Sequence, residues 1–281
     1  MGAQMGCEYA LAGHDVALVA RDAAAVEERL ERALELVRDH GLASAERVEA
    51  ARARTTVGSD LAAVAACDLA VESVPEELEL KADLLRVVAE ASPHAVLATN
   101  TSSLSITELG EAIGAPERTI GTHYLNPPLL MPPVEVVPGE RTAPEVVTRV
   151  CDTIRELGKR PVVVERDVPG FVWNRLQMAV LREALWIVEN GVASPDTVDE
   201  VLSYGLARRW SNIGFFQGIA LGGVGTWQRV SGNLLPELST ATELPDLRQW
   251  VSPPDERLDE VARRRDLGLA EDLFRDRKDG S

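Results

Sequence analysis

An α/β domain built on a mainly parallel sheet, followed by an all-helical domain, is the fold class that this sequence predicts. From residue 16 to about 165, short β-branched runs alternate with longer helical patterns, as they do in βαβ units. The pattern changes near Pro169-Gly170, which precedes long helical patterns. A length of 281 residues also suits two domains better than one. We therefore expect domains at 1–167 and 168–281.

Seven short apolar runs predict the strands of the first domain. They are Val16–Ala20, Thr55–Gly58, Leu69–Glu72, Ala95–Thr99, Thr119–His123, Val134–Val137 and Val162–Val164. Helical patterns fit between most of these runs. The clearest is Ala23–Asp39, where apolar residues recur at spacings of three and four and so form one stripe facing the sheet.

The second domain is predicted to consist of helices. One helix runs from about Phe171 to Glu189 and is ended by Asn190-Gly191. The run Ser194-Pro195-Asp196 is typical of a helix start, with a serine cap and proline in the first turn, and we expect this helix to reach Ser203. A turn or hinge is expected at Ser252-Pro253-Pro254. The charged, amphipathic tail Leu258–Asp279 would then pack on the core or on a partner subunit.

Composition excludes several classes of function. With 29 basic and 45 acidic residues, the net charge of -16 disfavours nucleic acid and anionic membranes as partners. No apolar stretch has the length of a membrane span, and no signal peptide is visible. The three cysteines, at 7, 67 and 151, lack the spacing of metal ligands and, being odd in number, favour a reducing compartment. We therefore expect a cytoplasmic protein without a metal site.

The start of the chain indicates a dinucleotide-binding unit. Met1-Gly2 opens a helical pattern that ends at Gly13 and is followed by the strand from Val16, as after a phosphate loop. The first strand and the first two glycines of G-x-G-x-x-G are missing, so Gly2 would be the third glycine, which allows close packing of helix on strand. We therefore expect the chain as written to bind dinucleotide poorly, and to be less stable than a version extended by roughly 8–12 residues.

Four further motifs follow in order. They are Glu72-Ser73-Val74-Pro75-Glu76, the run 99–106 (TNTSSLSI), the run 121–137 that begins Gly-Thr-His-Tyr-Leu-Asn-Pro-Pro, and the run 169–176 (PGFVWNRL). Together with the start of the chain they resemble the 3-hydroxyacyl-CoA dehydrogenase superfamily over residues 1 to about 230. The resemblance implies a Rossmann domain, a helical domain that makes a homodimer interface, and an active site in the cleft between the two domains.

The resemblance also implies the catalytic residues. Oxidation of a secondary alcohol needs a base for the hydroxyl proton, and a histidine that titrates near neutrality suits that task. His123 matches the family base, and Glu135 matches the carboxylate that orients its imidazole. Ser102 and Asn174 match the residues that contact the hydroxyl and carbonyl oxygens of the substrate.

The cofactor is expected to be NAD or NADP, with NAD slightly favoured. Residues that match the family positions around the nicotinamide and its ribose are Ser73, Glu76, Lys81, Asn100 and Asn126. At the end of the second strand of the unit, Ala20 stands where an acid usually binds the ribose diol. Arg21 could pair with a 2′-phosphate, while Asp22 could replace the missing acid.

The resemblance implies an (S)-3-hydroxyacyl thioester, such as a CoA ester, as the substrate, interconverted with the 3-ketoacyl compound. A free 3-hydroxy acid is the alternative, because the acid-rich run 27–32 (EERLER) suits CoA phosphates poorly. The runs 205–210 and 253–257 also resemble the branch of lambda-crystallin and gulonate 3-dehydrogenase. Arg208 and Arg209 are candidates to meet a free carboxylate. A crystallin-like protein without activity, or a truncated inactive form, is the remaining alternative.

Overall fold

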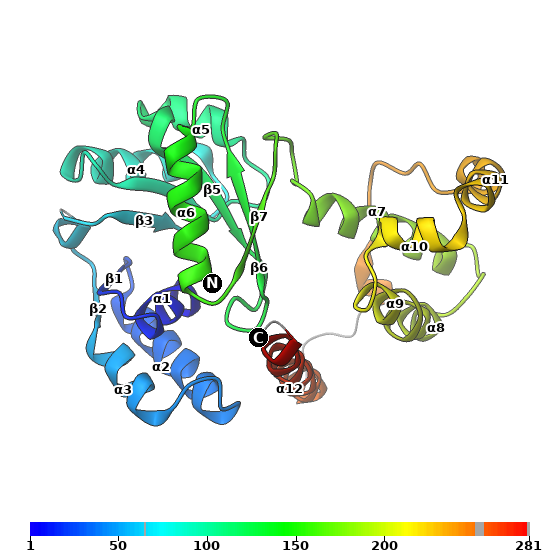
Figure 1. Cartoon of the computed structure of the whole chain (residues 1–281), viewed down its shortest axis with the longest axis horizontal. Helices are drawn as coiled ribbons and strands as arrows, with labels where there is room; N and C mark the ends of the chain where they lie inside the picture. The colour runs from blue at the N-terminus through cyan, green and yellow to red at the C-terminus, as the bar shows by residue number, and fades with distance from the viewer. Residues whose placement is uncertain (65, 251–255, 280–281) are drawn as a thin grey trace. The chain divides into compact units, whose positions relative to one another are not determined.

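The computed structural model describes residues 1–64, 66–250 and 256–279, and these form two compact units (Figure 1). The N-terminal unit contains residues 1–172 together with the C-terminal helix α12 (Glu256–Asp279), and the helical unit begins at Trp173. The sequence places this boundary at 167/168 and assigns the tail to the second domain, so the structure divides the chain differently. The expected turn at Ser252-Pro253-Pro254 lies outside the described residues.

The N-terminal unit alternates strands and helices. Its strands are β1 (Val16–Val19), β2 (Thr55–Gly58), β3 (Leu69–Glu72), β4 (Val96–Thr99), β5 (Thr119–Tyr124), β6 (Pro133–Pro138) and β7 (Arg160–Val163). Its helices, besides α12, are α1 (Gly2–Leu11), α2 (Ala23–Asp39), α3 (Ala45–Ala53), α4 (Leu78–Ala91), α5 (Ile106–Ile113) and α6 (Pro144–Glu156). All seven predicted strands are present, each within about two residues of its expected bounds.

The strands form two sheets. Strands β1 and β2 pair in parallel, while the second sheet has the order β3-β4-β5-β6-β7. Among the described residues no strand joins the two sheets, and α1 is the first element of the chain. The weak dinucleotide binding expected of the chain as written stays a prediction.

One strand pair departs from the parallel arrangement. Strands β5 and β6 are antiparallel, whereas the pairs β3–β4, β4–β5 and β6–β7 are parallel. The connection 125–132 is shorter than the dozen or so residues that a parallel crossover requires, so the chain reverses direction. This reversal places residues of β5 and β6 directly opposite one another.

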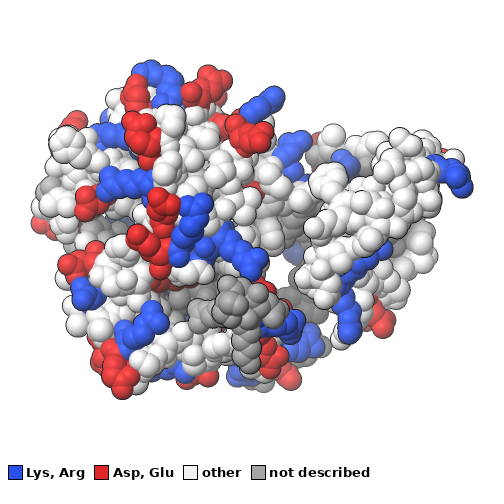
Figure 2. Space-filling view, in the orientation of Figure 1, with Lys and Arg blue, Asp and Glu red and all other residues white. Residues whose placement is uncertain are grey.

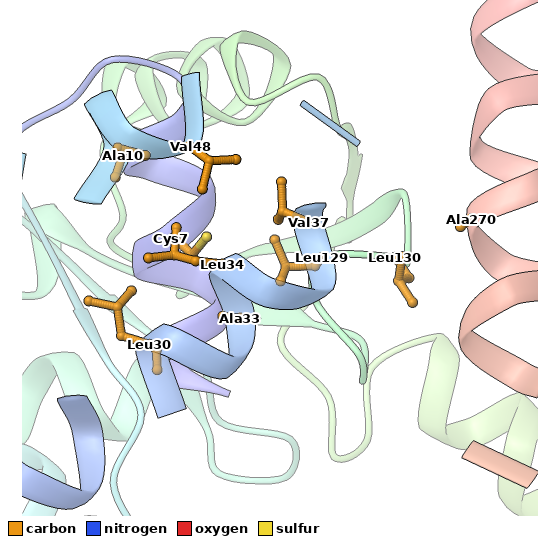
Figure 3. Packing of buried hydrophobic residues seen from close by; sticks show 12 residues of the cluster. Cys7, Ala10, Leu30, Ala33, Leu34, Val37, Val48, Leu129, Leu130 and Ala270 are labelled. Atoms are coloured by element: carbon orange, nitrogen blue, oxygen red, sulfur yellow. The ribbon is translucent and has the colours of Figure 1, made fainter. Parts of the chain in front are cut away.

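A hydrophobic cluster joins α1, α2, α3 and α12 (Figure 3). Cys7 of α1 and Leu34 of α2 are buried at its centre, as the apolar stripe of the second helix predicts. Ala270 of α12 is 2% exposed and belongs to the same cluster as Leu129 and Leu130. Ala270, together with the partly buried Leu269 and Leu273, therefore attaches the tail to the N-terminal unit.

The helical unit contains the helices α7 (Trp173–Glu189), α8 (Pro195–Glu200), α9 (Arg208–Trp210), α10 (Phe215–Gly222) and α11 (Val224–Leu234), with a π-helical segment at Val201–Ala207. Ser194 caps α8 with its hydroxyl, as predicted. Of residues 173–250, Ser239 alone is buried. The visible face of this unit carries mostly uncharged side chains (Figure 2). Among all described residues, no helix is long and apolar enough to cross a membrane.

Candidate active site

The antiparallel pair β5–β6 brings together the predicted base and its carboxylate. His123 and Glu135 are direct partners in the register of the two strands. The His123 Nδ1 atom lies 2.7 Å from Glu135 Oε2, and both side chains are buried. Because an ionised carboxylate only accepts hydrogen bonds, the imidazole donates its Nδ1–H to Glu135. The Nε2 atom of His123 then carries the lone pair.

Ser102 completes a chain of three side chains. Its Oγ lies 3.2 Å from His123 Nε2, so the hydroxyl donates to the lone pair of the neutral imidazole. Ser102 belongs to the loop between β4 and α5, at the carboxyl end of a parallel strand, where ligands bind in open α/β sheets. The structure thus brings together three of the four predicted catalytic residues.

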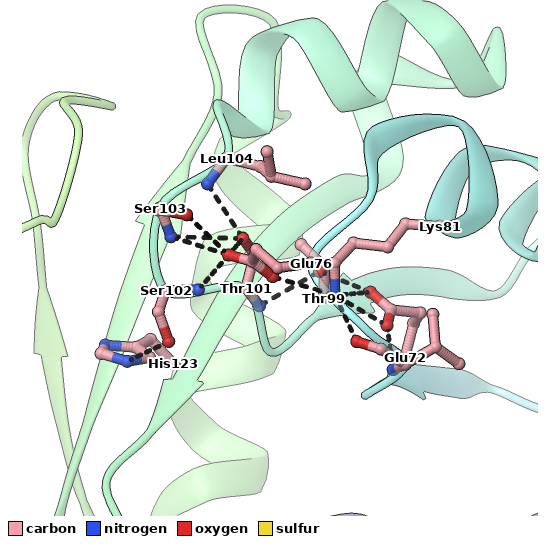
Figure 4. A network of polar contacts seen from close by, with 10 residues as sticks. Glu72, Glu76, Lys81, Thr99, Thr101, Ser102, Ser103, Leu104 and His123 are labelled. Atoms are coloured by element: carbon pink, nitrogen blue, oxygen red, sulfur yellow. Dashed lines mark hydrogen bonds and ion pairs between the residues drawn. The ribbon is translucent and has the colours of Figure 1, made fainter.

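The loop that carries Ser102 is bound by one carboxylate (Figure 4). Glu76 Oε1 accepts hydrogen bonds from the backbone N–H of Ser102 at 2.9 Å and of Ser103 at 3.0 Å. The hydroxyls of Ser103 and Thr101 donate to the same oxygen. Burial alone would raise the pKa of Glu76, but these hydrogen bonds and the charge of Lys81 lower it to about 2.

Lys81 lies behind Glu76 and is 1% exposed. Its Nζ donates to Glu72 Oε1 at 2.9 Å and to the carbonyl of Val74 at 3.0 Å, and lies 3.3 Å from Glu76 Oε2. Glu72 also accepts a hydrogen bond of 2.7 Å from Thr99. The three donors of the ammonium are therefore directed at protein atoms, and in this structure Lys81 acts on Glu72 and Glu76.

Three of the predicted nicotinamide positions, Ser73, Asn100 and Asn126, lie just beyond strand ends, and Ser73 lies near the start of α1. Ser73 follows β3, and a Cβ built on Gly2 would lie 3.9 Å from the Ser73 Cβ. The first N–H groups of a helix have no partner within it, so this junction fits an anionic pyrophosphate. Asn100 follows β4, and its Oδ1 accepts the Tyr124 N–H at 2.8 Å. Asn126 is exposed just beyond β5.

One glycine assignment needs correction. The sequence assigns close packing of helix on strand to Gly2, but a side chain at Gly2 would make only ordinary contacts. The tight approach of α1 to β1 occurs instead at Gly6, where a Cβ would lie 2.6 Å from the Leu18 Cδ2. Gly2 stays a prediction for cofactor binding.

The residues at the end of β1 differ in exposure and in hydrogen bonding. Ala20 is half-buried and donates its backbone N–H to the Gly58 carbonyl, while Arg21 is exposed. Asp22 accepts the Ala25 N–H at 3.0 Å and caps α2. Asp22, which the sequence offers as a substitute for the missing ribose-binding acid, therefore also serves as the N-cap of a helix.

The fourth predicted catalytic residue, Asn174, lies in the first turn of α7 and belongs to the helical unit. Sequence reasoning missed two residues that the structure places at the pair. Val172 donates its N–H to Glu135 Oε1 at 3.0 Å, and the ring of Phe171 contacts that of His123. The sequence signal nearest to these two residues is the Pro169-Gly170 turn, which predicts a domain boundary but not a contact with the catalytic pair.

This arrangement defines a class of protein: an α/β dinucleotide-type domain that carries a hydrogen-bonded serine, histidine and glutamate at its strand ends. The chain belongs to the 3-hydroxyacyl-CoA dehydrogenase family. The NAD-binding domain of that family matches residues 1–168, and its C-terminal domain matches residues 170–249. The resemblance drawn from the sequence is confirmed.

Known relatives of this chain are named for different dehydrogenase activities. The chain is 40% identical over 183 residues to 5-formyl-3-hydroxy-2-methylpyridine 4-carboxylate 5-dehydrogenase of Mesorhizobium japonicum, covering 65% of this chain and 59% of that protein. It is 36% identical over 239 residues to L-carnitine dehydrogenase of Pseudomonas aeruginosa, covering 85% of this chain and 71% of that one. A crystal structure of the pyridine carboxylate enzyme, described as an NAD+-dependent dismutase, gives a TM-score of 0.85 at 30% identity, covering 96% of this chain and 93% of that one.

Proposed function

We propose that this protein is an NAD(P)-linked dehydrogenase that oxidises the hydroxyl of a 3-hydroxyacyl compound to a ketone. The observation that carries the proposal is the hydrogen-bonded chain of Ser102, His123 and Glu135. His123 Nε2 takes the hydroxyl proton, and Glu135 stabilises the imidazolium that forms. Ser102 and Asn174 are proposed to orient the substrate oxygens. When bound, the oxidised nicotinamide accepts the hydride from the carbinol carbon.

The cofactor is proposed to bind along the carboxyl ends of β3 and β4. Gly2, Ser73, Asn100 and Asn126 would line its pyrophosphate and nicotinamide ends, with Lys81 acting through Glu76. The family match favours NAD over NADP. Placing an acid at Ala20 (Ala20→Asp) should raise the ratio of kcat/KM for NAD to that for NADP, since a carboxylate binds a ribose diol and repels a phosphate. An unchanged ratio would show that Ala20 does not face the adenosine ribose.

The substrate is proposed to be a 3-hydroxyacyl thioester with the (S) configuration that the family resemblance implies. A free 3-hydroxy acid is the second candidate, and the surface of α2 favours it. Arg52 forms ion pairs with Glu27 and Glu31, and Arg32 pairs with Glu28 at 2.6 Å. Arg32 and Arg52, which could meet CoA phosphates, are therefore paired with neighbouring acids.

Steady-state turnover decides between these substrates. Acetoacetyl-CoA, with the reduced cofactors, would be compared with free 3-hydroxy acids, including L-carnitine, with the oxidised ones. A His123→Gln variant is the control for adventitious activity. Turnover that depends on His123 with either substrate class supports the proposed reaction, and the higher kcat/KM identifies the carrier. Parental turnover by the His123→Gln variant would overturn the mechanism.

A homodimer through the helical unit is also proposed. Leu176, Phe216 and Leu221 are 65%, 81% and 80% exposed in the single chain. Apolar surface on this scale marks a surface that another protein covers. A second copy of the same chain is the simplest partner, because closed symmetric homodimers are the commonest oligomers.

A cytoplasmic location of the protein is proposed because its cysteines are free thiols. Cys7, Cys67 and Cys151 are free thiols, and Cys7 and Cys151 are buried. Thiols persist in compartments that glutathione keeps reducing.

A further inference from the structure

Phe171 lies against the catalytic pair without any role in the proposed reaction. Its side chain is 1% exposed and packs with Ile106, Val137 and Val164. The ring centroid lies 5.6 Å from that of His123 at an interplanar angle of 61°, an edge-to-face contact. Such pairs restrict both rings to a narrow range of orientations.

The backbone of Phe171 is strained. Its φ of +48° makes it the one residue other than glycine with a positive φ among those that the structure describes. A bulky residue rarely adopts this left-handed conformation, which persists only where surrounding contacts determine it. The preceding Gly170 also has a positive φ, of 77°, so two left-handed residues follow one another.

The turn has a direct consequence for Glu135. It directs the backbone N–H of Val172 at Glu135 Oε1, at 3.0 Å, while Oε2 of the same carboxylate accepts from His123. The carboxylate is therefore oriented through one oxygen and orients the imidazole through the other. At the opposite end of the segment, Asp167 accepts hydrogen bonds from Ser105 Oγ at 2.6 Å and from the Thr107 N–H at 2.9 Å. The segment is thus anchored on both sides of its turn.

We propose that Phe171 is a positioning residue: its left-handed turn aims the Val172 N–H at Glu135, while its ring fixes the plane of His123. This inference rests on the proposed function only in taking His123 as the base of a dehydrogenase reaction. It concerns the orientation and tautomer of the imidazole, which exist without substrate. A residue that only filled the core would stabilise the fold and leave the tautomer unchanged.

Two substitutions separate the ring from the turn. Phe171→Ala and Phe171→Gly both remove the ring, but glycine adopts a positive φ without penalty and preserves the turn. Leu34→Ala is the control, because Leu34 is 1% exposed in the cluster of α1 and α2 and its loss destabilises the fold elsewhere.

The readout is the ¹⁵N spectrum of the histidines in the full chain, without substrate and at a pH where imidazole is neutral. The chain has four histidines, and the spectrum of His123→Gln assigns the catalytic one. The parent and Leu34→Ala should show the Nδ1–H tautomer. Phe171→Ala should show a mixture of tautomers, and Phe171→Gly should stay closer to the parent.

Turnover gives the second measurement. We expect kcat to fall about tenfold in Phe171→Ala and about threefold in Phe171→Gly, with KM almost unchanged, because small misplacements of a catalytic group lower the rate of chemistry. A parental His123 spectrum in both variants would overturn the proposal, as would an equal disturbance in Leu34→Ala. If no substrate is turned over, the spectra still decide the positioning role, so failure of the proposed function is recognised separately.

Discussion

The two units of this protein differ in how they bury their apolar residues. In the N-terminal unit, α2 presents Leu30, Leu34 and Val37 to a closed cluster in which each is at most 1% exposed. In the helical unit, Leu176, Phe216 and Leu221 are each at least 65% exposed. Similar apolar residues on similar helices therefore have opposite environments.

This difference bears on the stability of each unit and on the place of the proposed chemistry. The N-terminal unit contains its own core and three of the four predicted catalytic residues, so it is expected to fold and to hold the Ser102–His123–Glu135 chain by itself. The helical unit cannot gain much from burial within residues 173–250, and its stability must come from surfaces beyond them. Four predictions test or sharpen this contrast, from the largest expected effect to the smallest.

Lys81→Met tests whether the interior of the N-terminal unit depends on its buried charges. The variant leaves Glu72, which is also buried, without its ammonium partner. Breaking a buried ion pair from one side costs about 3–5 kcal/mol, because an uncompensated charge stays in the interior. Urea denaturation measures the loss. Arg32→Met, which breaks an exposed pair with Glu28, is the matched control and should change the free energy of unfolding by less than about 1 kcal/mol. Equal effects would refute the structural role of Lys81.

His123→Gln and Asn174→Ala compare the chemical contributions of the two units. Loss of the base should lower kcat by about a hundredfold, with the fold intact. Loss of one substrate hydrogen bond from the helical unit should lower kcat/KM only about tenfold. Steady-state kinetics on variants with parental circular dichroism provides the measurement. The reverse order of effects would move the chemistry to the helical unit.

Charges on the exposed face of the helical unit should break the proposed dimer. Phe216→Glu and Leu221→Glu, combined, are expected to weaken association at least about tenfold, since a desolvated charge opposes burial. Sedimentation velocity reports the change. Val87→Glu places the same charge on α4 at a residue 42% exposed, and should leave the oligomeric state unaltered. A monomeric parent protein would remove the proposal.

Glu76→Gln should reduce the acid sensitivity of the N-terminal unit. The pKa of Glu76 is lowered from 4.5 to about 2, so its ionised form stabilises the fold above pH 4.5 and loses this contribution as the pH falls to about 2. Because the side chain is 37% exposed, solvent screening reduces the effect at neutral pH to about 1 kcal/mol. Denaturation midpoints across this range test it. Ser103→Ala removes one donor and should shift the profile part of the way, whereas parallel profiles for parent and Glu76→Gln would contradict the assignment.

The strands could be predicted because their signals are local. Runs such as Val96–Thr99 alternate with helical stripes at periods that sequence alone reveals. His123 and Glu135 were found through motifs that resemble a known family, and the strand pairing then placed them 2.7 Å apart. The turn signal at Pro169-Gly170 predicts a boundary at 167/168, and the contacts of Phe171 and Val172 with the His123–Glu135 pair extend the compact N-terminal unit to Val172.

What the sequence determined by itself is therefore the order of elements, the family and a set of candidate site residues. Tertiary structure decided which partners those residues have. The family resemblance places Lys81 at the cofactor, and the fold brings Glu72, nine residues earlier, against it. Phe171 is predicted to begin a helix, but it adopts a left-handed turn that places the Val172 N–H on Glu135. The tail helix joins the N-terminal unit through Ala270. The physical reason is the same in each case: propensity and periodicity act between neighbours along the chain, while hydrogen bonds and burial depend on segments that only folding brings into contact.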